Sequence, residues 1–403
     1  MADWSQLPVE LLSSIAERFI HFQFNLLRFR SVCSSWRSSF PFSHYPVPSK
    51  FPILSNDSPS HDWTFSLSKR TLFLLNPPPA LSIANPHPWL FKIQQHVRAG
   101  TITMDLFDPL SRYPIKSLPL DFPKLLDVYD LPIVELGQEY VLNDINFRSV
   151  NPSDDASSLY LEKVVFTWLN PKFEEFVLLT IHVSGKLAFF KSGDKEWTII
   201  PDMPTPYDDV CVFQGKLYAV DNTGRTVVVG LDSSVSMVAE AVYGGDKKLL
   251  VESNGELLLV DKHLSYDYQS LGIYDAFDDE VLGFGCEKAV KFDIYKLNEG
   301  GNEWVELKSL GDRVLMFGDD CAFSASASEL SMSKGNCIIF RDDFFDDDVK
   351  EDGVGVFHLD DDRISPISDC PGYSKLFWPP PDWLRLLRLR LLSLSISEVI
   401  YGK

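Results

Sequence analysis

One adjacent pair of aspartates in this sequence supplies carboxylates that could do acid–base chemistry. Asp208 and Asp209 follow the proline-containing segment PDMPTPY at 201–207. A positioned carboxylate pair can give and take protons during catalysis. Aspartates beside prolines are also typical of surface turns, because their short side chains bond to the neighbouring backbone. We interpret this pair as a surface turn and not as a catalytic dyad.

A second acidic stretch, Asp342 to Asp352, contains the ligand type that calcium prefers, but its spacing does not fit. In a calcium loop beginning at Asp348, Lys350 takes the place of a carboxylate. Leu359 takes the place of the final bidentate glutamate. We therefore expect a solvated loop insertion that keeps the protein soluble.

Other catalytic and cofactor motifs are absent from the sequence or incomplete. There is no H-E-x-x-H metal motif, no G-x-S-x-G nucleophile elbow and no phosphate loop. Gly283-Phe284-Gly285 begins like a dinucleotide fingerprint, yet Lys288 stands where the third glycine belongs. Cys33 has apolar helical neighbours, which indicate a core or interface residue. We predict no catalytic, cofactor-binding or metal-binding residues, and an enzyme whose site is assembled by folding remains an alternative.

Charge and cysteine usage limit the partners and the compartment. The formal net charge is −20 at pH 7, from 37 basic and 57 acidic residues. This balance argues against nucleic acid or an anionic membrane as the partner. The six cysteines are scattered without a C-x-x-C pair, and we expect neither a secretory signal nor a membrane span. We expect a reducing compartment, the nucleus or the cytoplasm.

The elements that must position such residues change character along the chain. Residues 4–40 have helical spacing, with Pro8 in a first turn and Leu11, Leu12 and Ile15 on one face. Asn25 is expected to cap a second short helix, which a third follows. Prolines and serines then predict a linker, and the helical period nearly vanishes beyond it.

Strand pairs joined by turns replace the helices. In KLLVESNGELLLV (248–260), Asn254-Gly255 supplies the two positive φ angles of a type I′ turn between apolar runs. We expect further hairpins with turns at 192–195, 222–224, 298–302 and 360–362, and in two of them a tryptophan (Trp197, Trp304) follows the turn. Repeated hairpins with an aromatic residue at a fixed place are typical of propeller blades.

The fold class that follows is α+β and multidomain, with a small helical N-terminal unit before a mainly-β domain. About 45 residues per blade predict a β-propeller of six or seven blades. An irregular β-sandwich or two β domains is the alternative fold. The last segment contains Pro379 to Pro381 and a tail rich in leucine and arginine. We expect that tail to pack on the β domain, and a membrane surface or a partner groove is its alternative site.

The first forty residues resemble an F-box. The resemblance depends on Leu7-Pro8, Leu11-Leu12 and Ile15, followed at the family's distance by R-x-V-C-x-x-W-R at Arg30 to Arg37. It implies three short helices that dock on a Skp-type adaptor and, through it, on a cullin–RING ubiquitin ligase. The residues that it assigns to adaptor binding are Leu7, Pro8, Leu11, Leu12, Ile15, Val32, Cys33 and Trp36. The alternative role for Leu12, Phe29 and Trp36 is in the core of the unit itself.

The rest of the chain is similar to plant F-box proteins of the SKIP/KIB type, whose C-terminal domain is kelch-like. GKLYAVDNTG, the tryptophan hairpins and the FWPPPDW ending carry this similarity. The implied organisation is an F-box (1–42), a Pro/Ser-rich linker (43–63), a propeller-like recognition domain (64–383) and a C-terminal tail (384–403).

The function implied by this resemblance is that of a non-catalytic substrate receptor in a Skp–cullin–F-box ubiquitin ligase. Such a receptor presents a target protein, which the sequence does not identify, for ubiquitination. Two alternatives are a propeller that binds or regulates a partner such as a kinase without degrading it, and a propeller enzyme or small-molecule sensor.

Overall fold

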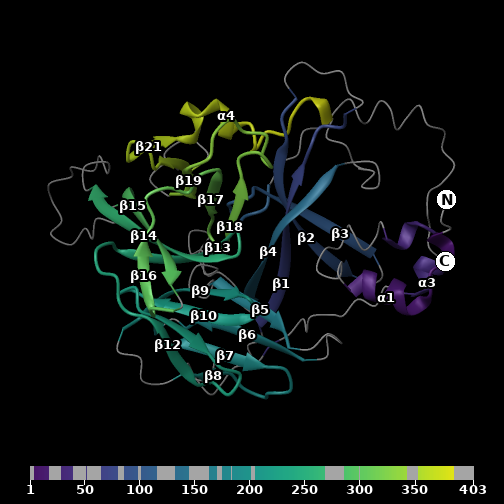
Figure 1. Ribbon diagram of the computed structural model, residues 1–403, viewed down its shortest axis with the longest axis horizontal. Helices are drawn as coiled ribbons and strands as arrows, with labels where there is room; N and C mark the ends of the chain where they lie inside the picture. Colours follow the sequence, from purple (N-terminus) through teal and green to yellow (C-terminus); the bar gives the residue numbers. More distant parts are fainter. Residues whose placement is uncertain are drawn as a thin grey trace, which may run out of the picture.

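The computed structural model describes most of the helical unit and of the β domain. Its described residues are 4–17, 29–39, 51, 65–79, 86–98, 101–115, 132–144, 163–169, 175–182, 184–200, 205–267, 286–298, 300–342 and 353–384. The expected cap Asn25, most of the linker and the C-terminal tail after Leu384 lie outside these residues. Figure 1 shows the N-terminal helices, in purple, to one side of the β domain.

The strands of the first half of the β domain form three blades. Blade 1 comprises β1 (Phe65–Leu75), β2 (Trp89–Arg98), β3 (Thr101–Phe107) and β4 (Ile133–Asp144). Blade 2 comprises β5 (Lys163–Trp168), β6 (Phe176–Ile181), β7 (Leu187–Lys191) and β8 (Thr198–Ile199). Blade 3 comprises β9 (Tyr207–Phe213), β10 (Lys216–Asp221), β11 (Thr226–Val229) and β12 (Val235–Ala239).

Two more blades complete the ring. Blade 4 comprises β13 (Lys247–Ser253), β14 (Glu256–Asp267), β15 (Cys286–Asn298) and β16 (Glu303–Glu306). Blade 5 comprises β17 (Arg313–Phe317), β18 (Ala322–Ser326), β19 (Cys337–Arg341), β20 (Val354–His358) and β21 (Arg363–Pro366), in the order β18-β17-β19-β20-β21.

The described strands therefore make five blades, although hydrogen bonding alone gives four sheets. Blades 1 and 2 share one sheet, in which β4 and β5 pair only through Tyr140 with Val164 and Val141 with Lys163. Five blades stand in place of the six or seven expected. Blade 1, from Phe65 to Asp144, and blade 4, from Lys247 to Glu306, are longer than the roughly 45 residues that the expectation assumed, whereas blades 2 and 3 are shorter. The long blades leave residues for fewer blades in all.

Local turn chemistry fixes the hairpins where the sequence predicts them. Asn254 and Gly255 have φ angles of 55° and 77°, and Ser253 pairs with Glu256 across the turn. This is the predicted type I′ turn. Gln214 and Gly215, between β9 and β10, have φ angles of 48° and 75°, so that a Gln-Gly pair makes a similar turn. The hairpins expected at 192–195, 222–224, 298–302 and 360–362 are also present.

A closing segment, Ile367 to Leu384, joins the last blade to the first. It contains η4 (Ile367–Asp369) and α4 (Pro371–Ser374). The Leu376 carbonyl oxygen accepts the Leu90 N–H at 2.7 Å, and the Trp383 indole N–H donates to the His87 carbonyl oxygen at 2.9 Å. Leu72, Leu74 and Leu90 of blade 1 share one buried cluster with Val314, Met316 and Phe377. The ring is closed by this shared core.

One segment expected as a linker and one expected as a solvated loop each make a buried contact at one residue. Phe51, in the predicted linker, is only 2 % exposed and packs against Phe176, Phe190 and Trp197 of blade 2. Asp342, the first residue of the predicted acidic loop, is buried and accepts the Ala289 N–H at 2.9 Å. The remainder of that loop, 343–352, lies outside the described residues.

Candidate functional site

The helical unit is held by a small core of its own. Its described elements are η1 (Trp4–Gln6), α1 (Val9–Glu17), a helical turn at 29–31 and α3 (Ser34–Ser39). Leu12 and Ala16, one turn apart on α1, are fully buried with Phe29. The Trp36 ring lies 4.7 Å from the Phe29 ring, and its indole N–H donates to the Trp4 carbonyl oxygen.

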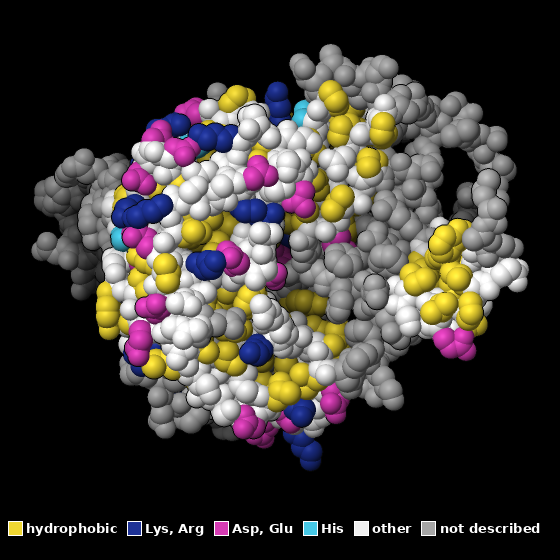
Figure 2. Space-filling view, in the orientation of Figure 1, with side chains coloured by type: hydrophobic (Ala, Val, Ile, Leu, Met, Phe, Trp, Pro, Cys, Tyr) yellow, Lys and Arg dark blue, Asp and Glu magenta, His cyan; other side chains and the backbone are white. Residues whose placement is uncertain are grey.

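The same unit leaves large apolar side chains exposed. Trp4, Val9, Leu11 and Val32 are 64 %, 56 %, 52 % and 54 % exposed. Figure 2 shows hydrophobic side chains gathered on the helical unit, at the right of the view. Single exposed apolar residues are common on protein surfaces, but a group of them on so small a unit indicates an interaction site. We call Trp4, Pro8, Val9, Leu11 and Val32 the apolar face of the helical unit.

The predicted adaptor-binding residues separate into three classes in the structure. Pro8, Leu11 and Val32 are exposed and belong to the apolar face, whereas Leu7, Ile15, Cys33 and Trp36 are half-buried. Leu12 is fully buried in the core of the unit, which is the alternative role that the sequence left open for it. Trp4 and Val9, which flank the Leu-Pro step and were not selected from the sequence, also belong to the apolar face.

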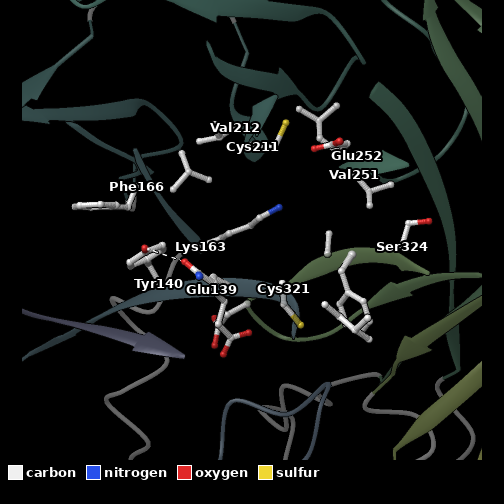
Figure 3. Close-up of a pocket in the computed structure, with 18 of the residues that line it drawn as sticks. Glu139, Tyr140, Lys163, Phe166, Cys211, Val212, Val251, Glu252, Cys321 and Ser324 are labelled. Carbon is white, nitrogen blue, oxygen red and sulfur yellow. Dashed lines mark hydrogen bonds between the residues drawn. The ribbon is translucent and has the colours of Figure 1, made fainter. Parts of the chain in front are cut away.

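The second candidate site is a pocket at the centre of the propeller. Its volume is about 390 Å³, and the strands β4, β5, β9, β13 and β18, one from each blade, supply most of its walls. Figure 3 shows the Lys163 side chain directed into this space, with Cys211 and Glu252 across it and Cys321 toward one end. This position on the axis is that of a propeller and not of a sandwich, whose two sheets pack face to face.

Asp208 and Asp209 lie next to this pocket and correct the interpretation as a surface turn. Both lie on strand β9, and Asp209 is only 3 % exposed. The Asp209 carboxylate binds the Lys163 ammonium at 2.8 Å and accepts the Leu250 N–H at 2.7 Å. Asp208 accepts the Lys248 N–H at 2.8 Å, and burial raises its pKa. The pair links blades 2, 3 and 4, and no turn geometry is involved.

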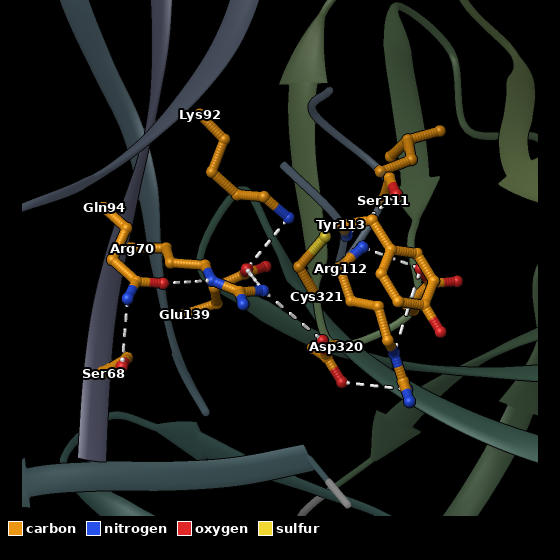
Figure 4. Close-up of polar contacts among 12 residues, drawn as sticks. Ser68, Arg70, Lys92, Gln94, Ser111, Arg112, Tyr113, Glu139, Asp320 and Cys321 are labelled. Atoms are coloured by element: carbon orange, nitrogen blue, oxygen red, sulfur yellow. Dashed lines mark hydrogen bonds and ion pairs between the residues drawn. The ribbon is translucent and has the colours of Figure 1, made fainter. Parts of the chain in front are cut away.

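A buried ion network lies where blade 1 meets blade 5 (Figure 4). The Glu139 Oε1 atom binds the Lys92 ammonium at 2.9 Å and the Arg70 Nη1 atom at 3.2 Å. The Asp320 carboxylate binds Arg112 at 3.1 Å and lies 3.7 Å from Arg70. Buried charges are retained in folded proteins only when they are paired in this way. Sequence reasoning missed this network because its members are up to 250 residues apart.

The two thiols that line this pocket are not activated. Burial raises the pKa of the Cys211 thiol to about 12 and also raises that of Cys321, so that neither thiol is an activated nucleophile. The described residues that line the pocket include no histidine. Among the residues that the structure describes, no group of three or more His, Cys, Asp or Glu side chains is placed to hold a metal ion. Nor does any described helix have the length and apolarity needed to cross a membrane.

Comparison with known proteins finds relatives that are similar to this chain over most of its length. Residues 64–358 match the model of the family described as KIB1-4 beta-propeller. The F-box protein SKIP23 of Arabidopsis thaliana is 40% identical over 399 residues, which cover 95% of this chain and 96% of that protein. The F-box protein At2g17036 of the same plant is 34% identical over 405 residues and 95% of each chain. These alignments extend through both the helical unit and the propeller.

Proposed function

This chain belongs to the plant F-box proteins with a KIB1-4 β-propeller, and on that premise we propose that it is a substrate-receptor subunit of a Skp–cullin–F-box ubiquitin ligase. The helical unit binds a Skp-type adaptor, and the propeller binds a target protein. Neither unit carries out bond chemistry in this assembly. The observation that carries the proposal is the apolar face, which the small core beneath it leaves uncovered.

Interface energetics support the adaptor as the cover for this face. Burying a large aliphatic or aromatic side chain completely stabilises a complex by about 1.5–3 kcal/mol. A central group of such residues carries most of the affinity of a typical protein interface. The exposed Leu11 and Val32 are therefore proposed as adaptor contacts, together with Val9 and Trp4.

The propeller contributes proximity. A target held by the propeller and a ubiquitin-loaded enzyme held through the adaptor react within one assembly. Such tethering gives an effective concentration in the millimolar range for short linkers. The five cysteines whose side chains the structure describes are all free thiols, which supports the nucleus or cytoplasm as the compartment.

The adaptor contact is tested by co-purification of the full-length chain with a plant Skp homologue. We expect Leu11→Ser/Val32→Ser to reduce adaptor recovery at least tenfold, because two apolar contacts worth about 1.5 kcal/mol or more each are lost. Leu231→Ser is the matched control, because Leu231 is 52 % exposed on blade 3 and should leave recovery unchanged. Full recovery of the double variant, or equal loss in the control, would overturn the assignment.

Degradation of the target is tested separately from adaptor binding. Targets are captured by proximity labelling with the Leu11→Ser/Val32→Ser variant, which should retain them without passing them to the ligase. We expect the captured proteins to accumulate in cells when the proteasome is inhibited. Unchanged abundance would instead favour the alternative of a propeller that binds or regulates a partner, such as a kinase, without degrading it.

A further inference from the structure

Outside the two sites described above, a thiol, an imidazole and a hydroxyl meet on blade 5. We propose that Cys370 is a modification site, at which hydrogen peroxide oxidises the thiol to a sulfenic acid with His358 as the base. The proposal concerns the chemistry of this cluster and does not depend on the ligase function.

The cluster is assembled from three neighbouring elements. The His358 Nε2 atom lies 3.7 Å from the Cys370 Sγ atom, within the range for a hydrogen bond to sulfur. The Ser365 Oγ atom lies 3.4 Å from the same Nε2 atom and 3.5 Å from the sulfur. His358 ends β20, Ser365 lies on β21, and Cys370 links η4 to α4. Strands β20 and β21 and the start of the closing segment thus place a nucleophile beside a base.

The charge state of His358 suits the role of a base. Burial lowers its pKa, and the positive charge of Arg363 lowers it further. Lys334 acts in the same direction, whereas Asp361 and Asp360 raise it. The net direction of the pKa shift is downward, so that the ring is neutral at physiological pH. In the tautomer that carries its proton on Nδ1, the Nε2 lone pair accepts the thiol proton.

The chemical environment, more than exposure, separates Cys370 from the other described thiols, because only Cys337 among them is fully buried. Cys370 and His358 are both half-buried, which leaves a path for an oxidant as small as peroxide. Burial raises the pKa of Cys337 to about 11 and that of Cys211 to about 12. Thiols with a raised pKa form little thiolate and react slowly. The described helical unit that holds Cys33 contains no histidine.

The reaction balances without any further co-reactant. As the thiol proton passes to His358, the sulfur attacks one peroxide oxygen and the O–O bond breaks. The leaving hydroxide takes the proton from the imidazolium and forms water. The sulfur is oxidised by two electrons to the sulfenic acid, and the peroxide is reduced to water. His358 is restored to its neutral state.

Oxidation of Cys370 should weaken the packing that joins blade 5 to blade 1. Cys370 packs against the buried cluster that joins blade 5 to blade 1, at the start of the closing segment. A sulfenic acid adds a polar oxygen at the edge of this apolar cluster, where polar atoms are costly unless they are hydrogen-bonded. We therefore expect the oxidised chain to melt at a lower temperature than the reduced chain.

The test uses the full-length protein, hydrogen peroxide and dimedone, with each cysteine quantified by peptide mass spectrometry. Cys370 should be trapped as its sulfenic acid about tenfold or more faster than Cys337 and Cys211. His358→Gln should slow trapping at Cys370 by about tenfold, because a general base contributes at least that much. His263→Gln is the matched control, since His263 pairs with Asp293 on blade 4, away from the thiol.

Alkylation by iodoacetamide provides a second readout that a structural change alone would not produce. The alkylation rate at Cys370 should fall as the pH is lowered and His358 becomes protonated. His358→Gln should remove this step from the plot of rate against pH. If Cys370 is trapped no faster than Cys337 in the wild-type chain, the proposal is wrong. It is also wrong if a folded His358→Gln variant reacts at the wild-type rate. Should that variant fail to fold, the comparison among wild-type cysteines and the alkylation pH profile still decide.

Discussion

Leu11 and Leu12 are neighbours in the sequence, yet the helix directs them to opposite roles. Leu12 is fully buried against Ala16 and Phe29, whereas Leu11 is 52 % exposed. Leucine composition and helical spacing predicted that both would be important, but they did not separate the buried side chain from the exposed one. That separation depends on where Phe29 and Trp36 pack, which only the folded unit shows.

The different roles of the two leucines lead to opposite mutational effects. Leu12→Ala should destabilise the helical unit by about 2–5 kcal/mol, because it leaves a cavity in a core of a few residues. Leu11→Ala should leave stability within about 0.5 kcal/mol, as is usual for exposed positions. Limited proteolysis of the full-length chain, followed by mapping of cleavages in residues 1–42, measures both. Equal protection of the two variants would contradict the placement of Leu12.

Asp320 carries a pH dependence of its own. Burial raises the pKa of its carboxyl from 3.8 to about 6, although Arg112 and Arg70 oppose the shift. Because the folded state holds this proton more tightly than the unfolded state, the contribution of Asp320 to stability falls as the pH rises from about 4 to about 6. Above about pH 6, the raised pKa of Asp320 has lowered the free energy of unfolding by its full amount, about 3 kcal/mol.

The sign of this effect is checked with Asp320→Asn. Urea unfolding of both proteins between pH 4 and pH 7 gives the difference in unfolding free energy at each pH. We expect that difference to move in favour of the asparagine variant as the pH rises to 6, and then to stay constant. A difference that moved toward the wild type over the same interval would mean that the ion pairs outweigh desolvation.

At the scale of elements, the hairpins were predictable and the connections between blades were not. Asn254-Gly255 and the other turns are set by residues adjacent in sequence, so that local turn chemistry identifies them. The interpretation of Asp208 and Asp209 was wrong because their backbone partners, at Lys248 and Leu250, lie forty residues away. A repeat as degenerate as this one likewise gave no reliable blade count.

Phe51 shows the same limit in the segment between the two units. Proline and serine content predicted a linker, but a single aromatic residue docks on blade 2, with its ring 5.4 Å from that of Phe190. Phe51→Ala should cost about 3 kcal/mol and lower the melting temperature of the propeller by roughly 5 °C. Val305→Ala, at a half-exposed position on β16, is the control and should shift the melting temperature little. An unchanged melting temperature in Phe51→Ala would show that this contact does not stabilise the blade.

At the scale of the whole molecule, the propeller depends on joining its first blade to its last. Three kinds of contact make this joint: the shared apolar cluster, the buried ion network around Arg70 and Asp320, and the closing segment. The FWPPPDW ending, which carried part of the family resemblance, supplies this last contact through Trp383. The sequence indicated that the ending was characteristic, and the structure gives the reason, because Trp383 and Leu384 are buried against blade 1.

Trp383 therefore offers a direct test of ring closure. Trp383→Ala removes a buried ring and should cost about 3–5 kcal/mol of unfolding free energy. Trp383→Phe keeps most of the apolar contact but removes the N–H that binds the His87 carbonyl oxygen, and should cost about 1 kcal/mol. Chemical denaturation followed by circular dichroism measures both, and adaptor recovery should stay unchanged because the helical unit is untouched. If the two variants lose equal stability, the hydrogen bond and not the packed ring holds the closing segment, and the account of closure by a shared apolar core is wrong.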